Sequence, residues 1–359
     1  MCSWSRTTLR IAGALDAQLS GTEIVRIAAR DTRNLEAWEN FVKANQAYWR
    51  FLPAEMDKAE KFAQRALQLD SDYMSASYML VYSYFTQAFQ GWVKDRSAAL
   101  ALARQINDKL FQRDPEFAPA YRLRARFAML WDLPEYDPEA ALADARKSVE
   151  LGPNDDLNHW TLGIVLFQLR HFDEATAEFA AAMRLNPHPP TFLPGSRAMA
   201  LSAAGHHDQA IADVEAAIAA NPKNPQGPRF RGEVEAWAGH YAGAAISFER
   251  ARELDPDSAQ FAYLLAAVYD QLGRIDDAIG LLDKGPLQWR SVPQIRLWLA
   301  LSYARAGRRE QAAAEFAAFR ALAPKFTVSI VRRDYSGYFE PKFFDRIVAL
   351  SLEYGIPEK

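Results

Sequence analysis

Alanine and larger apolar residues recur at helical spacing along most of this chain, as in AEFAAAMRL at residues 177–185. Alanine-rich stretches of this kind favour helix over strand. In the clearest segment, Leu162 and Gly163 fall in a first predicted helix, and Ala175, Phe179 and Ala182 fall in a second. The pattern therefore predicts pairs of amphipathic helices joined by short turns.

A proline that follows the second helix of each pair marks a repeat. Successive prolines are separated by 38, 34, 35, 34 and 68 residues, and 68 is twice 34, so the basic period is 34 residues. Ser71 takes the same place one unit earlier. The marking prolines are Pro115, Pro153, Pro187, Pro222, Pro256 and Pro324.

Three positions of the second helix carry small or apolar residues in unit after unit. Small residues let two helices approach to about 8–10 Å, and larger ones fill the space between neighbouring pairs. Turns such as AGHHDQA, LGRIDDA and AGRREQA carry the glycine and polar residues that end one helix and cap the next. Besides the first set, the positions are Ala59, Ala63 and Ala66; Ala210, Val214 and Ala217; Ala244, Phe248 and Ala251; and Ala312, Phe316 and Phe319.

Period, small residues and closing proline resemble those of the tetratricopeptide repeat family. The resemblance implies an all-α fold, a right-handed α-solenoid of about eight helical hairpins, preceded by a helical lead-in over residues 1–34. After the solenoid we expect a loop to Phe339 and a capping helix from Glu340 to Tyr354, within residues 325–359. The expected solenoid, residues 35–324, divides into units 35–71, 72–115, 116–153, 154–187, 188–222, 223–256, 257–290 and 291–324.

Two stretches depart from the repeat pattern. Residues 131–136 (WDLPEY) lengthen one hairpin turn, and Gly285-Pro286 is expected to shorten the second helix of the seventh unit. Both are expected to bend the superhelix locally.

A narrower resemblance involves the start of the chain. RIAGALDAQLSGTEIVRIAAR followed by NLEAWENFVKANQAYWRF is similar to the start of the repeat region in bacterial class III adenylate/guanylate cyclases with a TolB-like segment. The catalytic domain and the TolB-like segment of those proteins have no counterpart here. This raises the hypothesis that the chain is a truncated or separately started C-terminal piece of such a protein.

Composition excludes several classes of protein. The net charge is −3 and 24% of residues are charged, so no global basic field favours nucleic acid or anionic lipid. Cys2 is the only cysteine, which allows no internal disulfide and suits a reducing compartment. The sequence has no run of about 18 apolar residues that would predict a membrane span. We therefore expect a cytoplasmic protein.

The sequence contains no phosphate-binding loop, nucleophile elbow or zinc-protease motif. His171, His206 and His240 recur at one turn position, but equivalent turns about 10 Å apart cannot share a zinc ion whose ligands lie near 2 Å. Acidic pairs such as Asp276-Asp277 precede helices, where capping explains them. We therefore predict no catalytic residue, no metal and no cofactor.

The family resemblance places the first helix of each hairpin on the concave face, where a partner would bind. Aromatic and arginine residues there are of the types that dominate interfaces, and the arginines would select acidic groups. Inter-repeat packing is the alternative interpretation, at even odds for Trp160 and Phe167. The Lys/Asn set with which family members clamp a chaperone's C-terminal carboxylate is absent from these positions. The predicted groove residues are Tyr78, Tyr82, Phe85, Arg122, Arg126, Trp160, Phe167, Arg229, Glu233, Trp237, Tyr263, Asp270 and Arg305.

Three functions follow as hypotheses. The first is a non-catalytic scaffold that binds a peptide or helix of a protein partner in the concave groove. The second is the regulatory or oligomerising part of a nucleotide cyclase, and the third is a self-associating structural module. No nucleic acid partner is expected.

Overall fold

The computed structural model describes residues 31–130, 132–133, 135–186 and 189–359, and over these residues it contains helices and turns but no strand. The fold is an α-solenoid, as the periodicity predicted. The expected helices of residues 7–30, together with Cys2, Trp131, Pro134 and Pro187, lie outside the described residues. Among the helices that are described, none is long and apolar enough to cross a membrane.

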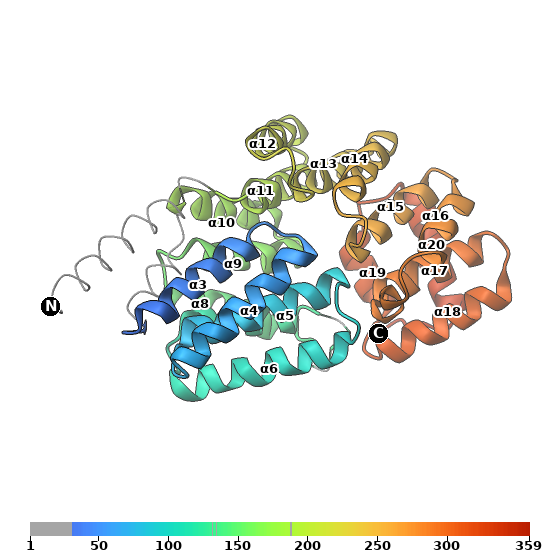
Figure 1. The fold of residues 1–359 in the computed structure, drawn as a ribbon. Coiled ribbons are helices and arrows are strands. Elements are labelled where there is room, and N and C mark those ends of the chain that lie inside the picture. Colours follow the sequence, from blue (N-terminus) through green and yellow to red (C-terminus); the bar gives the residue numbers. More distant parts are fainter. Residues whose placement is uncertain (1–30, 131, 134, 187–188) are drawn as a thin grey trace, which may run out of the picture.

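Helical hairpins follow one another along the chain and stack into a curved body (Figure 1). From α3 to α18, each α-helix packs against the next α-helix in sequence. The hairpins are α3 (Leu35–Tyr48) with α4 (Pro53–Leu69), α5 (Met74–Gln90) with α6 (Arg96–Arg113), α7 (Ala118–Ala128) with α8 (Pro138–Leu151), α9 (Asp156–Gln168) with α10 (Phe172–Leu185), α11 (Phe192–Ala203) with α12 (His207–Ala220), α13 (Gln226–Trp237) with α14 (Tyr241–Leu254), α15 (Ala259–Gln271) with α16 (Ile275–Asp283), and α17 (Pro293–Arg305) with α18 (Arg309–Leu322).

The small and apolar positions predicted for the second helices are buried in all five sets, which confirms their packing role. Gly163 on α9 shows why size matters there. A Cβ atom at this position would lie 2.6 Å from the Phe179 ring of α10. Gly232 has the same relationship to Phe248, at 2.7 Å. Each glycine therefore lets two helices of one hairpin touch.

The turn inside several hairpins has a residue in the left-handed backbone conformation. Gly205, Gly239, Gly273 and Gly307 take this conformation with φ between 73° and 91°. Arg170 takes the same place in the α9–α10 turn with φ 68°. A side chain disfavours this conformation, so the arginine at this turn needs a separate explanation.

The two predicted departures from the repeat are present. The connection between α7 and α8 is lengthened by the 131–136 insertion. α16 has nine residues and ends at Asp283, and a 3₁₀ helix, η1 (Leu287–Ser291), follows the Gly285-Pro286 pair. The proline ring cannot continue the α-helix, which explains the early end.

The C-terminal region differs from the expected loop and cap. Residues 325–339 are not an extended loop, because α19 (Val328–Tyr335) lies within them. α20 (Pro341–Glu353) begins after Glu340, as expected, and buries Phe343 and Ile347. Arg333 at the end of α19 donates a hydrogen bond to Tyr136 in the α7–α8 connection, and Tyr338 packs against Trp237 at the end of α13. The cap therefore reaches further than the last hairpin.

The curvature of the stack brings its second and seventh hairpins into contact. Gln90 at the end of α5 donates a hydrogen bond to Gln260 on α15 at 2.9 Å, and Ser258 donates one to Gln90 at 2.8 Å. Gly91 lies so close to Ala259 that a Cβ atom there would be 2.8 Å from the alanine Cβ. These contacts therefore join the second and seventh hairpins across the inner side of the solenoid.

Candidate functional site

The first helices of the hairpins surround an internal cavity of about 280 Å³. Side chains of α3, α5, α7, α9, α11, α13 and α15 line it. A second cavity of about 200 Å³ adjoins it, because both are bordered by Phe89, Phe167 and Glu233. Side chains of α17 and α19 complete the second cavity. The inner side of the stack, where a groove was expected, therefore contains two adjoining cavities.

The structure brings most predicted groove residues to these cavities and leaves four away from them. The first cavity is lined by Tyr82, Phe85, Arg126, Trp160, Phe167, Arg229 and Glu233. The second is lined by Phe167, Glu233, Trp237 and Tyr263. Tyr78, Arg122, Asp270 and Arg305 line neither of the two.

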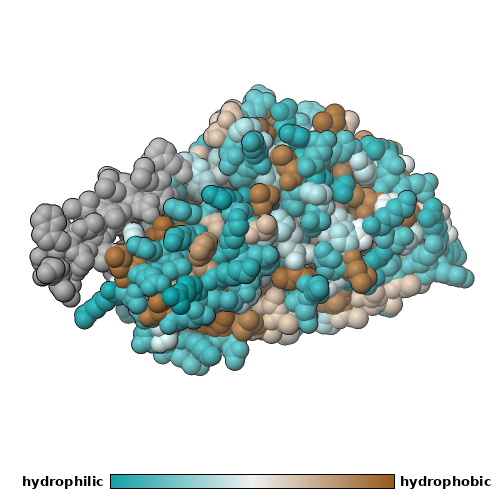
Figure 2. All heavy atoms as spheres, viewed as in Figure 1, coloured by the Kyte–Doolittle hydropathy of each residue, from teal (hydrophilic) through white to brown (hydrophobic). Residues whose placement is uncertain are grey.

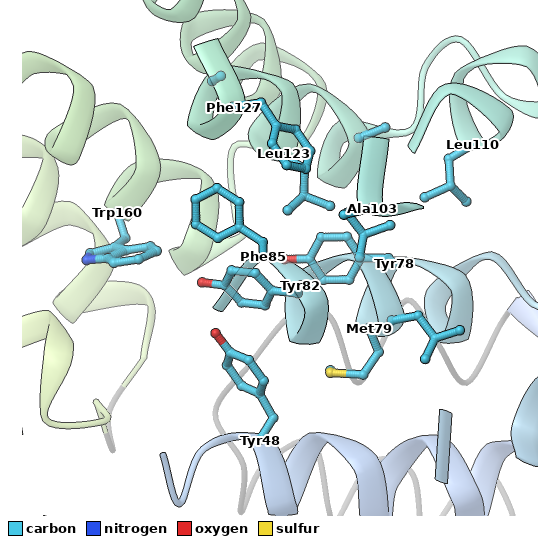
Figure 3. Packing of buried hydrophobic residues seen from close by; sticks show 14 of the residues in the cluster. Tyr48, Tyr78, Met79, Tyr82, Phe85, Ala103, Leu110, Leu123, Phe127 and Trp160 are labelled. Atoms are coloured by element: carbon cyan, nitrogen blue, oxygen red, sulfur yellow. The ribbon is translucent and has the colours of Figure 1, made fainter. Parts of the chain in front are cut away.

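Stacked tyrosines form one wall of the first cavity. The rings of Tyr48 and Tyr82 are stacked with centroids 4.7 Å apart, and the Tyr48 hydroxyl forms a 2.7 Å hydrogen bond with Thr86. Figure 3 shows the two phenol hydroxyls on the same side of α5, with Trp160 facing them from another helix. Burial raises the pKa of both tyrosines, so both remain protonated hydrogen-bond donors.

Arg122 is a core residue and not a free groove cation. Its guanidinium is 2% exposed and donates hydrogen bonds to Tyr78, Asp155 and Asn158. The ion pair with Asp155 has an N–O distance of 2.9 Å and joins α7 to the cap of α9. The interpretation of Arg122 as a selector of acidic partners was wrong, because the carboxylate it binds belongs to the next repeat.

Arg126 lies one helical turn further along α7 and has different surroundings. Its guanidinium lies between the rings of Phe85 and Trp160, at 4.8 Å from each centroid. The Trp160 indole donates a 3.0 Å hydrogen bond to Ser196 and is nearly buried, so this tryptophan also packs between repeats. Trp160 is therefore both a part of the cavity wall and a packing residue between repeats.

The other predicted arginines already have acidic partners. Arg229 donates a hydrogen bond to Glu233 at 2.5 Å within α13, and burial raises the pKa of Glu233 although the arginine opposes the shift. Arg305 donates one to Asp270 at 2.6 Å, and its guanidinium lies 4.6 Å from the Phe343 ring centroid on α20. Burial raises the pKa of Asp270 to about 6.

Residues from the C-terminal segment reach the second cavity, which the repeat pattern did not predict. Tyr338 packs edge-on against Trp237 with centroids 5.4 Å apart, and Phe339 packs against Trp298 at the same centroid distance. The aromatic run of residues 335–339 (YSGYF) was the signal in the sequence. It was not recognised because the segment lies outside the repeat frame.

Two aromatic residues near the first hairpin were also missed. Trp49 stacks on Phe192 of α11 with centroids 4.9 Å apart, although the two belong to the first and fifth hairpins. A contact between distant repeats depends on superhelical curvature, which a period of 34 residues does not specify. The described residues also contain no group of three His, Cys, Asp or Glu placed to hold a metal ion.

On most of the face in view, apolar residues occur in small groups separated by hydrophilic ones (Figure 2). Large apolar side chains exposed elsewhere include Ile246 on α14 and Leu287 in η1.

Comparisons with known proteins agree with this fold. Residues 196–246 and 238–291 each match a family described as tetratricopeptide repeat. Human Superkiller complex protein 3 is 27% identical over 250 residues, which cover 66% of this chain and 15% of that protein. The Mycosarcoma maydis small glutamine-rich tetratricopeptide repeat-containing protein 2 is 30% identical over 103 residues, 29% of each chain.

Among solved structures, the APC/C hetero-tetramer Cut9-Hcn1 contains a chain that superposes with a TM-score of 0.56 at 17% sequence identity. The match covers 88% of this chain and 57% of the other. That likeness concerns the fold alone. Since this chain spans a small part of the length of its curated relatives, their activities and partners do not transfer to it directly.

Proposed function

We propose that this tetratricopeptide-repeat chain is a non-catalytic protein-interaction scaffold, which holds a short segment of a protein partner against its inner wall. The observation that carries the proposal is a pair of partly exposed aromatic side chains at the junction of the two cavities. Phe167 on α9 and Trp237 on α13 pack edge-on with ring centroids 6.1 Å apart. Phe167 borders both cavities.

Aromatic residues that keep one face accessible on a rigid wall are the usual anchors of protein interfaces. Here helices from two different hairpins fix the pair, so little side-chain entropy remains to be lost on binding. A partner's apolar side chain placed against Phe167 and Trp237 would extend an aromatic cluster that the fold already holds in place.

The size of the inner space favours an extended segment over a helix. An α-helix with its side chains is about 10–12 Å wide. Cavities of about 280 and 200 Å³ suit individual side chains of a bound segment. We therefore narrow the expected ligand from a peptide or helix to a short extended segment that inserts individual side chains.

The test compares capture by three forms of the purified full chain. Wild type, the double variant Phe167→Ala with Trp237→Ala, and the control Ile246→Ala are used as bait, and bound proteins are quantified by mass spectrometry. Ile246 is 69% exposed on α14, so the control removes an apolar side chain away from both cavities. We expect a set of proteins that wild type and the control capture and the double variant loses. Equal capture by all three forms would refute the inner-wall site.

The cyclase hypothesis remains a prediction. It rests on the resemblance of residues 10–51, of which residues 10–30 lie outside the described part of the chain. DNA upstream of the start codon that encodes no cyclase-like sequence in any frame would contradict it. Self-association and a cytoplasmic location also remain predictions, and size-exclusion chromatography with light scattering tests the first of them.

A further inference from the structure

The larger of the two cavities is lined by an arginine, Arg126, whose charge no carboxylate of the described residues neutralises. In the part of the chain that the structure describes, Arg126 takes part in no hydrogen bond or ion pair, and its Nη1 atom is buried without a partner. The rings of Phe85 and Trp160 flank the guanidinium on the cavity wall. Aromatic faces stabilise a cation, but they leave its N–H donors unsatisfied.

A second donor without a partner belongs to the same lining. Gln226 uses its side-chain oxygen to accept a 2.7 Å hydrogen bond from Arg229, and its Nε2 atom is buried without a partner. Among the described residues that line this cavity, the buried side-chain atoms without a partner are therefore donors and not acceptors. Arg229 adds no free charge, because Glu233 neutralises it.

This polarity restricts the chemistry of a ligand. A peptide backbone brings N–H donors and carbonyl acceptors in equal number, and its donors would need acceptors in the wall. A carboxylate brings only acceptors and a negative charge, which suits a guanidinium and a side-chain amide. The volume of about 280 Å³ lies near the lower end of the usual range for small-molecule pockets, about 300–1,000 Å³.

We propose that this cavity is a binding site for a small organic acid with an apolar body. The carboxylate accepts hydrogen bonds from Arg126 and Gln226, and the apolar body packs against Phe89, Met129 and Phe192, which also line the cavity. The site goes beyond the proposed scaffold function, since no protein partner is needed to fill it. Its test is correspondingly independent of any partner.

Isothermal titration of the full chain with 4-phenylbutyrate measures the site directly. Two matched probes separate its parts: 4-phenylbutyramide keeps the shape and removes the charge, and butyrate keeps the charge and removes the ring. Hexanoate and indole-3-propionate extend the range of apolar bodies. We expect at least one of the three apolar acids to bind with one-to-one stoichiometry, and for 4-phenylbutyrate we expect the amide and butyrate to bind at least about tenfold more weakly.

Variants of α7 locate the carboxylate. Arg126→Gln should weaken binding of the acid at least about tenfold, and Arg126→Lys should weaken it less, because it keeps the charge and loses the two-pronged donor. Arg124→Gln is the matched control. Arg124 lies on the same helix, is half exposed and pairs with Asp144 at 2.6 Å, so its loss should leave affinity unchanged. If Arg126→Gln fails to fold, two measurements still test the proposal. They are the comparison of acid with amide on the wild-type chain and the affinity of Arg126→Lys for the acid.

Three results would overturn the proposal. One is the absence of binding by all three apolar acids at millimolar concentration, which would leave Arg126 as a packing residue hydrated by water. Another is binding that Arg126→Gln and Arg124→Gln weaken equally. The third is an acidic pentapeptide, Ac-Gly-Phe-Asp-Gly-Gly-amide, that binds more tightly than the acids with the same dependence on Arg126, which would assign the cavity to a protein segment.

Discussion

Arg170 donates a hydrogen bond to the backbone carbonyl oxygen of Ser336 at 2.7 Å, although the two are separated by 166 residues in sequence. The same guanidinium group donates to the carbonyl oxygen of Arg333 at 3.1 Å. Arg170 occupies the turn position that glycine holds in later hairpins, with φ 68°. The left-handed conformation costs an arginine about 1–2 kcal/mol at this turn. The two hydrogen bonds to the C-terminal segment offset that cost.

Replacing Arg170 separates the strain from the hydrogen bonds. Arg170→Ala removes the hydrogen bonds and keeps the strained backbone, whereas Arg170→Gly removes both. We expect both variants to be less stable than wild type. The free energy of unfolding of the alanine variant, measured by urea denaturation, should be about 1 kcal/mol lower than that of the glycine variant. Hydrogen exchange should become faster across α19 in both. Unchanged exchange there would mean that the aromatic contacts alone hold the segment.

Two glycines inside helices should respond oppositely to the same substitution. Gly163→Ala places a Cβ atom 2.6 Å from the Phe179 ring, so overpacking should cost about 1–3 kcal/mol. Gly280→Ala, on α16, meets no atom within 4 Å and should stabilise the chain by about 0.5–1 kcal/mol through helix propensity. Thermal unfolding followed by circular dichroism compares them. Similar shifts for both would mean that Phe179 moves aside at little cost.

The buried ion pair predicts strong coupling between Arg122 and Asp155. Arg122→Met leaves a buried carboxylate without its cation, which should cost about 3–5 kcal/mol. Adding Asp155→Asn removes that charge, and its side-chain oxygen can still cap α9, so the double variant should recover part of the loss. Urea denaturation of the four forms gives the coupling energy, and additive losses would contradict the pairing. Exchange of Arg122 for glutamate, which would place two carboxylates together in the core, is consequently expected to damage the fold.

Stability should depend on the protonation of Asp255. This side chain is buried after α14, no cation among the described residues pairs with it, and burial raises its pKa from 3.8 to about 6. Below about pH 4 it is protonated in both the folded and the unfolded chain, and no penalty arises. Between about pH 4 and 6 the unfolded chain ionises first, so folding stability falls as pH rises.

Asp255→Asn tests this dependence. The asparagine stays neutral, so the variant should gain about 1–3 kcal/mol at pH 8 and nothing at pH 3.5, and its stability should vary less between pH 4 and 6. Chemical denaturation at several pH values measures the difference. An equal change in stability at pH 3.5 and pH 8 would show that the carboxylate is solvated in the native state.

The repeat itself was predictable because its causes are local. The glycine of most turns, the proline after most second helices and small residues such as Ala175 and Ala182 act within one hairpin or between adjacent ones, so their spacing carries the information. The inner wall was predictable only in part. Arg122 lies on the first helix of its hairpin, as predicted, but its partner Asp155 lies 33 residues away and also accepts a hydrogen bond from the Leu157 N–H at the start of α9.

Contacts that depend on the curvature of the whole stack were not predictable from the period. The pairs Trp49–Phe192 and Gln90–Gln260 join hairpins that are not neighbours in sequence. α19 was missed because the sequence after the last repeat has no periodic counterpart with which to compare it. Such contacts decide the shape of the inner surface.

The hydrogen bonds among Gln90, Ser258 and Gln260 affect the order in which the repeats should unfold. An open array of repeats loses its ends first, since each hairpin is held only by its immediate neighbours. We expect contacts between the second and seventh hairpins to make the early and late repeats unfold together, as in a globular domain. Removal of the last two hairpins should for that reason loosen α5, even though several intact repeats lie between them.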